Sequence, residues 1–142
     1  MMEEVVSAVL ANDDGDILTL KRASHKKHYP GVWDTVAGKK EPNEGDEECL
    51  RREVMEELGI EDFDVLRQSR KTKYKDNGRE WLATIFLCKL KNDIIVLNEE
   101  HSEYRWMPLS RIREENCSQP FLKDLKIIFG IIDDNPEKNY SA

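Results

Sequence analysis

The sequence predicts an α/β fold in which helices cover a mixed β-sheet. Segments rich in β-branched and aromatic residues interleave with segments whose apolar residues recur every three or four positions. The chain has 142 residues, of which 39% are hydrophobic and 36% charged. This is enough for one domain with its own core. We therefore expect a single domain over residues 1–142, built on a mixed sheet.

The first part of the chain has the pattern of a hairpin followed by a basic loop. Residues 5–11 and 17–20 are apolar runs, and an Asp-Asp-Gly-Asp turn separates them. Residues 21–28 then collect lysines, histidines and one arginine, ahead of a Tyr-Pro-Gly turn and a short extended segment at residues 32–37. We expect this basic loop to lie directly before the main helix and its entry segment.

Residues 46–58 are predicted to form the main helix. They contain neither glycine nor proline, and Leu50, Val54 and Leu58 recur at a spacing of four. Gly59 follows where a helix C-cap is expected.

The rest of the chain is predicted to be β-rich and to end in helices. Strands are expected at residues 63–73 and 81–90 around a polar turn at 75–78, with shorter ones at 94–97 and 106–107. A short helix at 109–114 precedes a terminal helix at 118–132. Residues 133–142 are polar and are expected to form a loose tail.

Composition and net charge limit which binding partners and which cellular compartment we expect. The net charge is 22 − 29 = −7, so the chain lacks the general basic surface that binds a nucleic-acid polymer. A small polyanion needs only local cations or a bound metal. The three cysteines form no C-x-x-C pair, and the acidic start and short apolar runs are unlike a signal peptide or a membrane span. We expect a cytoplasmic protein that binds a small molecule, either monomeric or homodimeric.

Three glutamates of the predicted main helix project from one side. Glu53, Glu56 and Glu57 are related by spacings of three and four. Like charges at these spacings disfavour a helix by a few tenths of a kcal/mol per pair, and a divalent cation would reverse this cost. Oxygen ligands favour Mg²⁺ or Mn²⁺, which commonly also bind substrate phosphates. Taken alone, the spacing is more typical of a solvated acidic face.

Residues 38–60 resemble the Nudix box, G-x₅-E-x₇-R-E-U-x-E-E-x-G-U, where U is a bulky aliphatic residue. Its fixed and aliphatic positions are filled by Gly38, Glu44, Arg52, Glu53, Val54, Glu56, Glu57, Gly59 and Ile60. The opening hairpin, Arg22, residues 29–33, and Glu100 six residues before Trp106 are also similar to this family. The resemblance to MutT-like Nudix hydrolases implies an α/β/α sandwich with a mixed sheet.

The resemblance also implies an activity and a metal site. It implies a Mg²⁺-dependent pyrophosphohydrolase, with Mn²⁺ as a substitute, that cleaves a diphosphate linkage in a nucleoside diphosphate derivative. The implied metal ligands are Glu53, Glu56 and Glu57. Glu100 and the backbone carbonyl of Ala37 are further candidates.

Other residues receive roles around this metal site. By resemblance, Glu53 is the candidate general base, Arg52 orients the glutamates, and Glu44 braces the loop against Arg52. The candidate substrate contacts are Arg22, Lys39 and Tyr74. We interpret His101, beside Glu100, as a packing or capping residue.

Alternative functions share parts of this pattern. Isopentenyl-diphosphate isomerases have the same fold and a run like residues 29–33, but they need a cysteine shortly after the tryptophan, and the first cysteine here is Cys49. A non-catalytic nucleotide sensor typically has a degenerate box, whereas this box is intact.

Lys75 stands where the ADP-ribose branch commonly has proline, and Tyr74 lies slightly earlier than the tyrosine of diadenosine-polyphosphate branches. A (deoxy)nucleoside triphosphate is therefore the leading substrate by default.

Overall fold

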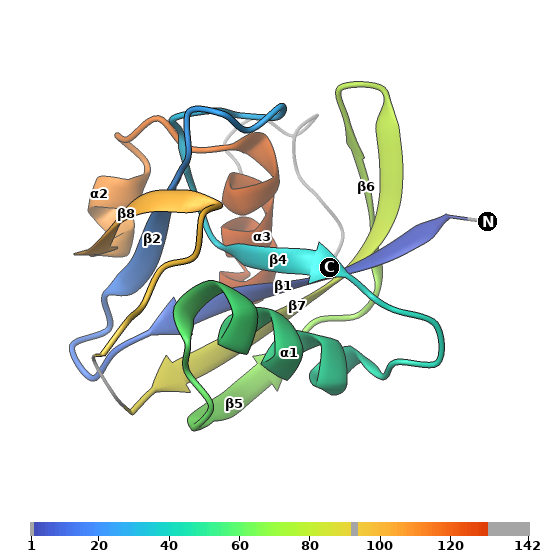
Figure 1. The fold of residues 1–142 in the computed structure, drawn as a ribbon, viewed down its shortest axis with the longest axis horizontal. Coiled ribbons are helices and arrows are strands. Elements are labelled where there is room, and N and C mark those ends of the chain that lie inside the picture. The colour runs from blue at the N-terminus through green and yellow to red at the C-terminus, as the bar shows by residue number, and fades with distance from the viewer. Residues whose placement is uncertain (1, 92–93, 131–142) are drawn as a thin grey trace.

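The computed structural model describes residues 2–91 and 94–130. The elements are β1 (Glu3–Ala11), β2 (Ile17–Arg22), β3 (Trp33–Asp34), β4 (Val36–Lys39), α1 (Asp46–Leu58), β5 (Phe63–Gln68), β6 (Thr72–Asp76), β7 (Arg79–Leu90), β8 (His101–Met107), α2 (Leu109–Ile112) and α3 (Gln119–Phe129). Within these residues, eight strands form one sheet, with α1 in front of it and α3 behind it (Figure 1). The predicted α/β/α sandwich with a mixed sheet is confirmed.

The centre of the sheet is a parallel pair of long strands. β1 pairs with β7 over its whole length, from Glu3 opposite Trp81 to Ala11 opposite Lys89. The other edge of β1 pairs antiparallel with β4 and, at Ala11 only, with β2. The predicted opening hairpin is therefore joined only next to its turn, because β2 diverges to pair with β3 and β8.

Two cores lie on opposite faces of this sheet, because side chains alternate along its strands. Along β7, Phe86, Cys88 and Leu90 pack with α1, whereas Ile85 and Leu87 pack with α3. β1 divides its side chains in the same way. The α1 face carries the acidic helix, so its core holds that helix in place.

Helix α1 begins and ends at the predicted residues, because both ends are encoded locally. Gly45 is the extended N-cap, and its N–H donates to the Glu48 carboxylate at 3.2 Å. Gly59 has a φ of 70° and its N–H donates to the Met55 carbonyl. The buried stripe of α1 contains Leu50, Val54 and Leu58.

Some predicted elements need correction. Residues 94–97 form no strand: Val96 N–H donates to the Leu58 carbonyl at 2.9 Å, and these residues join no ladder. The strand predicted at 63–73 is interrupted after Gln68, where the Ser69 hydroxyl accepts a hydrogen bond from Ile85 N–H. The strand predicted at 106–107 is part of the longer β8, which pairs with β2.

The C-terminal helices are shorter than predicted. α2 ends at Ile112, and α3 runs from Gln119 to Phe129 between its N-cap Ser118 and its C-cap Gly130. The predicted tail at 133–142 lies outside the described residues. In the part of the chain that is described, no helix is long and apolar enough to cross a membrane.

Candidate active site

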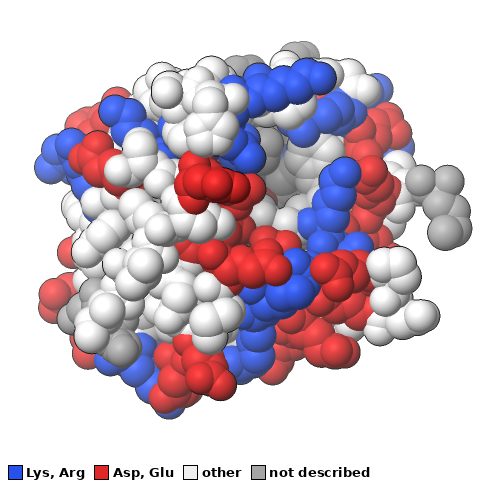
Figure 2. Space-filling view, in the orientation of Figure 1, with Lys and Arg blue, Asp and Glu red and all other residues white. Residues whose placement is uncertain are grey.

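A cleft of about 670 Å³ brings the predicted site residues together. It lies between the end of β4, the loop that follows, α1 and the segment before β8. Six of the predicted residues line it: Ala37, Lys39, Arg52, Glu53, Glu56 and Glu100. In Figure 2, a band of Asp and Glu side chains crosses this face of the molecule beside a hollow. The cleft therefore joins residues 37–56 with residues 98–100, which are distant in sequence, in a strongly acidic setting.

Arg52 is the centre of an ion-pair network at the cleft. Its Nε and Nη2 donate to the two carboxylate oxygens of Glu44 at 2.8 and 3.0 Å, a two-point contact that fixes the guanidinium plane. Nη2 also donates to the Lys39 carbonyl at 3.0 Å, which ties α1 to the loop. Nη1 donates to Glu53 Oε1 at 2.8 Å and to Glu56 Oε1 at 3.3 Å. The bond from Arg52 lowers the pKa of Glu44 to about 2.

Gly38 allows β4 to pass directly against the Glu53 carboxylate. A Cβ atom at position 38 would lie 2.1 Å from Glu53 Cδ, much closer than atoms can approach. Its φ is not in the left-handed region, so the requirement for glycine here is one of space. The close approach places the Glu53 carboxylate beside the backbone of β4.

Glu53 and Glu57 form the buried part of the acidic cluster. The Glu53 side chain is 12% exposed and that of Glu57 is 2% exposed. Burial raises the pKa of Glu53. Burial, followed by the charges of Glu100 and Glu53, raises the pKa of Glu57 to about 10. Glu57 Oε2 is buried without a hydrogen-bond partner. These carboxyl groups are thus held together at a cost that only a cation or a proton offsets.

Glu100 and His101 complete this edge of the cluster. Glu100 is 40% exposed and pairs with Lys26 of the basic loop at 3.2 Å. His101 is buried, with its Nδ1 3.7 Å from Glu57 Oε1. Burial lowers the pKa of His101 to about 4. The basic loop, the start of β8 and the end of α1 therefore meet at Glu100 and His101.

The three predicted substrate contacts lie in different surroundings. Lys39 lines the cleft, is 71% exposed and pairs with Glu3 at 3.2 Å. Arg22 donates from Nε to the His28 carbonyl at 2.8 Å and lies 3.5 Å from Asp34, so its guanidinium braces the basic loop. A direct contact between Arg22 and substrate stays a prediction.

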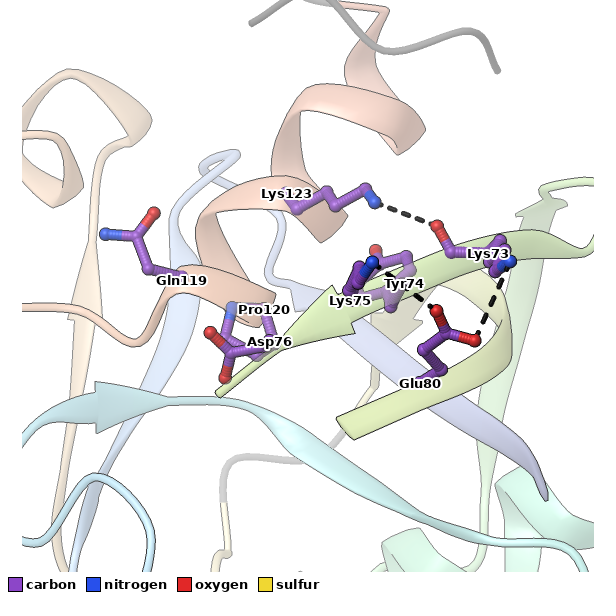
Figure 3. Close-up of a pocket in the computed structure, with 8 residues that line it drawn as sticks. All are labelled: Lys73, Tyr74, Lys75, Asp76, Glu80, Gln119, Pro120 and Lys123. Carbon is purple, nitrogen blue, oxygen red and sulfur yellow. Dashed lines mark hydrogen bonds and ion pairs between the residues drawn. The ribbon is translucent and has the colours of Figure 1, made fainter. Parts of the chain in front are cut away.

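Tyr74 does not line the cleft. It is 2% exposed, packs in the core between the sheet and α3, and its hydroxyl donates to the buried Asp124. Figure 3 shows it between lysines of β6 and α3, in a separate pocket of about 420 Å³ that Lys73, Lys75 and Lys123 also line. A contact between Tyr74 and substrate stays a prediction. Its burial was not predicted, because burial beneath α3 is a tertiary effect, whereas position next to a turn is a local one.

Comparison with known proteins identifies the family. The family model of the NUDIX domain matches residues 1–125, which include the whole cleft. The chain belongs to the Nudix family. The signature at residues 38–60 therefore corresponds to a real Nudix box, whose arginine and glutamates form the network described above.

Relatives and solved structures agree with this assignment. Nucleoside triphosphatase NudI of Escherichia coli K12 is 32% identical over 117 residues, covering 75% of this chain and 83% of NudI. The MutT protein of Methanosarcina mazei Go1 superposes with a TM-score of 0.76 at 27% identity, covering 91% of this chain and 93% of that one. An Ap4A hydrolase of Caenorhabditis elegans shares the fold, with a TM-score of 0.73 at 20% identity over 91% and 96% of the two chains. The chain is a Nudix hydrolase, an enzyme that acts on phosphorus-containing anhydrides.

The donor set of this Nudix site fits a hard divalent cation. The acidic groups at the cleft supply oxygen atoms only, as Mg²⁺ and Mn²⁺ prefer, and the Glu57 carboxylate has an unpaired oxygen. As the side chains stand, no three Asp, Glu, His or Cys residues within 2–91 and 94–130 are already arranged around one point. Arg52 holds Glu53 and Glu56. Small rotations of glutamate side chains would therefore accompany metal binding.

Two contacts of the Nudix site escaped the sequence analysis. Lys26 belongs to the predicted basic loop, and it pairs with Glu100 across 74 residues of sequence. The pair of His101 and Glu57 spans α1 and β8, and nothing local to either segment predicts it. The only available signal was that His101 follows a predicted metal ligand directly.

Proposed function

We propose that this Nudix hydrolase is a Mg²⁺-dependent pyrophosphohydrolase whose substrate is a (deoxy)nucleoside triphosphate. The observation that carries the proposal is the buried acidic pair of Glu53 and Glu57 beside an open cleft, with one carboxylate oxygen unpaired. The substrate class is supported by the 32% identity to a protein named nucleoside triphosphatase NudI.

The residues that would hold the cation are the carboxylates of the cluster. Glu53, Glu56 and Glu57 lie on one side of α1, Glu100 faces them from the segment before β8, and the Ala37 carbonyl belongs to the same cleft. A bound Mg²⁺, or Mn²⁺ in its place, would neutralise phosphate oxygens and lower the pKa of a bound water. Without a cation, the raised pKa values of Glu53 and Glu57 reflect the cost of keeping these buried carboxyl groups ionised.

The chain's own residues supply the remaining steps. Glu53 would accept the proton of the water that attacks phosphorus, as the bridging P–O bond breaks and the leaving phosphate keeps its electron pair. The Arg52 bond at 2.8 Å orients the Glu53 carboxylate, and the two-point contact with Glu44 fixes Arg52 in turn. The products would be a nucleoside monophosphate and pyrophosphate, or a monophosphate and an X-phosphate for other substrates.

Lys39 is the best placed cation for substrate binding. It lies in the cleft, and its ion pair with Glu3 joins two exposed side chains that exchange easily with solvent. A triphosphate chain reaching the cluster would replace Glu3 as its partner. Arg22 would act through the loop that it braces.

A substrate panel tests the proposal. Nucleoside triphosphates, nucleotide sugars and dinucleoside polyphosphates are incubated with Mg²⁺ and with EDTA, and pyrophosphate and phosphate are measured separately. We expect pyrophosphate release from a triphosphate that EDTA abolishes. Release from another class of compound would contradict the proposed triphosphate substrate. Activity in EDTA would contradict the proposed metal dependence.

The panel also separates the alternatives. Nucleotide-dependent binding of a protein partner, with no release from any compound, would indicate a sensor that uses the fold without turnover. Isomerisation of isopentenyl diphosphate is the least favoured outcome, because Asp34 to Gly38 contain no cysteine.

A further inference from the structure

Three buried polar atoms without a hydrogen-bond partner occur together in the described part of the chain. They are Glu57 Oε2 and both ring nitrogens of His101. The side chains of these residues are 2% and 3% exposed, and His101 Nδ1 lies 3.7 Å from Glu57 Oε1. Unpaired buried polar atoms are rare, so a pair of neighbours that both have them indicates an interaction that forms in another state of the protein.

The position of the imidazole is fixed by the sheet. His101 is the first residue of β8 and lies opposite Arg22 in the pairing with β2. The preceding peptide is also anchored, because Ala23 N–H donates to the Glu100 carbonyl at 2.9 Å. Glu57 comes from the last turn of α1, whose end is capped by Gly59. The sheet and the helix therefore bring the two side chains together without help from solvent.

In the proposed metal-bound state, in which Glu57 is ionised, the imidazole and the carboxylate are complementary. A neutral imidazole has one N–H donor and one acceptor nitrogen, whereas a carboxylate has only acceptors. A cation at the cluster would keep the Glu57 carboxylate ionised, and an N–H donor beside it would then gain a charge-assisted bond.

We propose that His101 is a positioning residue for Glu57, donating its Nδ1–H to Glu57 Oε1 and so presenting Oε2 to the divalent cation. This inference rests on the proposed metal site but adds a residue outside the Nudix box. Closing a gap of 3.7 Å needs only a small rotation of either side chain. Groups that hydrogen-bond to metal ligands in this way typically change metal affinity when they are removed.

The test measures Mn²⁺ binding without substrate, by electron paramagnetic resonance on the full chain. His101→Leu keeps the bulk and removes the donor, whereas His101→Asn places an amide N–H near the position of Nδ1. Ser102→Ala is the matched control, because Ser102 is the exposed next residue of β8. We expect His101→Leu to weaken Mn²⁺ binding about 10–100-fold and His101→Asn to restore it to within about threefold of wild type. Ser102→Ala should leave Mn²⁺ binding unchanged.

The outcomes separate this inference from the proposed function. Equal losses in the Leu and Asn variants would show that His101 only packs, and an unaltered Leu variant would show that it is not needed. Either result overturns the positioning role while the metal site stands, provided that Glu57→Gln loses Mn²⁺ affinity. If Glu57→Gln binds Mn²⁺ normally, the proposed metal site fails and this inference fails with it.

A measurement on the unmodified chain covers the case in which the variants do not fold. The ¹⁵N chemical shifts of the His101 ring, recorded with Mg²⁺ bound, report which nitrogen carries the proton. We expect the neutral tautomer with the proton on Nδ1. A proton on Nε2 alone would overturn the proposal, because Nδ1 would then be unable to donate to Glu57.

Discussion

Two carboxyl groups are buried on opposite faces of the same sheet, and their surroundings differ. Asp124 of α3 is 2% exposed, and burial raises its pKa to about 8. Glu57 of α1 is equally buried, and burial raises its pKa to about 10. Asp124 accepts a hydrogen bond from the Tyr74 hydroxyl, whereas Glu57 has an unpaired oxygen and other acids around it.

The comparison of Asp124 with Glu57 indicates that burial alone does not identify a functional acid. Asp124 and Tyr74 satisfy one another inside an apolar core, so that pair serves the packing of α3 against the sheet. The acidic neighbours of Glu57 disfavour its ionised form, so only a proton or a cation offsets the cost of holding these groups together. We therefore assign function to the α1 face and structure to the α3 face.

Replacement of Glu57 by glutamine is expected to have the largest effect. Gln has the same shape but no charge, so turnover should fall roughly a hundredfold or more through loss of a metal ligand. The apo protein should unfold at the same or a higher temperature, because a buried carboxyl with a raised pKa destabilises the fold at neutral pH. Steady-state kinetics with Mg²⁺ and thermal unfolding in EDTA measure the two effects.

The same change on the other face is the matched control. Asp124→Asn is expected to keep turnover within about twofold, because Asp124 does not line the cleft. Near-normal activity of Glu57→Gln would contradict the metal site. A large loss of turnover in Asp124→Asn would contradict the division between the two faces.

Gly38→Ala should lower activity with little loss of stability. The added Cβ would lie 2.1 Å from Glu53 Cδ, so the carboxylate must move. Moving a flexible side chain is cheap for the fold, but a misplacement of about 1 Å can lower turnover 10–100-fold. Turnover and denaturant unfolding of the purified variant test this.

A second glycine provides the opposite pattern. Gly59 has a φ of 70°, so Gly59→Ala should cost about 1–2 kcal/mol of unfolding free energy while turnover of the folded fraction changes little. If Gly38→Ala lost stability and kept activity instead, the close approach to Glu53 would have no functional role.

The pH dependence of the unfolding free energy should reveal the raised pKa of Asp124. Its folded-state pKa of about 8 lies above the ordinary aspartate value of 3.8, so between these values the folded state binds more protons than the unfolded state. The contribution of Asp124 to stability is therefore present below pH 3.8 and lost as the pH rises towards 8. Between pH 5 and pH 8, wild type should lose about 1–4 kcal/mol more than Asp124→Asn.

Urea unfolding in EDTA at several pH values measures this difference. Glu57 contributes a slope of the same sign in both proteins, so the comparison with Asp124→Asn isolates Asp124. Parallel pH profiles would show that Asp124 titrates normally and is not part of a buried pair.

The sequence predicted the α1 face far better than the α3 face. α1 was predicted to the residue because its cap at Gly59 and its i+4 stripe are local signals. The glutamates follow from helix geometry, and their meeting with Arg52 and Glu44 follows from the family signature. The burial of Tyr74 was not predicted, because α3, fifty residues away, covers it.

Other failures have the same origin in contacts that are distant along the chain. Residues 94–97 form a continuous apolar run rich in β-branched residues, as a strand often does, yet a strand also needs a free edge, and Val96 N–H donates to the Leu58 carbonyl at the end of α1 instead. His101 and Glu57 meet only because β8 pairs with β2 while α1 packs on the sheet. Pairing partners of this kind are not encoded in either segment alone.

Lys26→Met is expected to have the smallest effect, and it tests the edge of the acidic cluster. The ion pair of Lys26 with Glu100 joins side chains that are 26% and 40% exposed, so its loss should change the unfolding free energy by less than about 0.5 kcal/mol. If Glu100 binds the proposed metal, Lys26 would compete with that metal for the Glu100 carboxylate. Its removal should therefore raise Mn²⁺ affinity about two- to threefold at low salt, and less at high salt.

Lys89→Met is the control for this change. Lys89 pairs with Asp13 at the far end of β1 and β7, away from the cleft, so its loss should leave Mn²⁺ affinity unchanged. Weaker Mn²⁺ binding in Lys26→Met would show that Lys26 holds Glu100 in place for the metal. The basic loop would then belong to the metal site itself, and the functional face would extend from α1 to this loop.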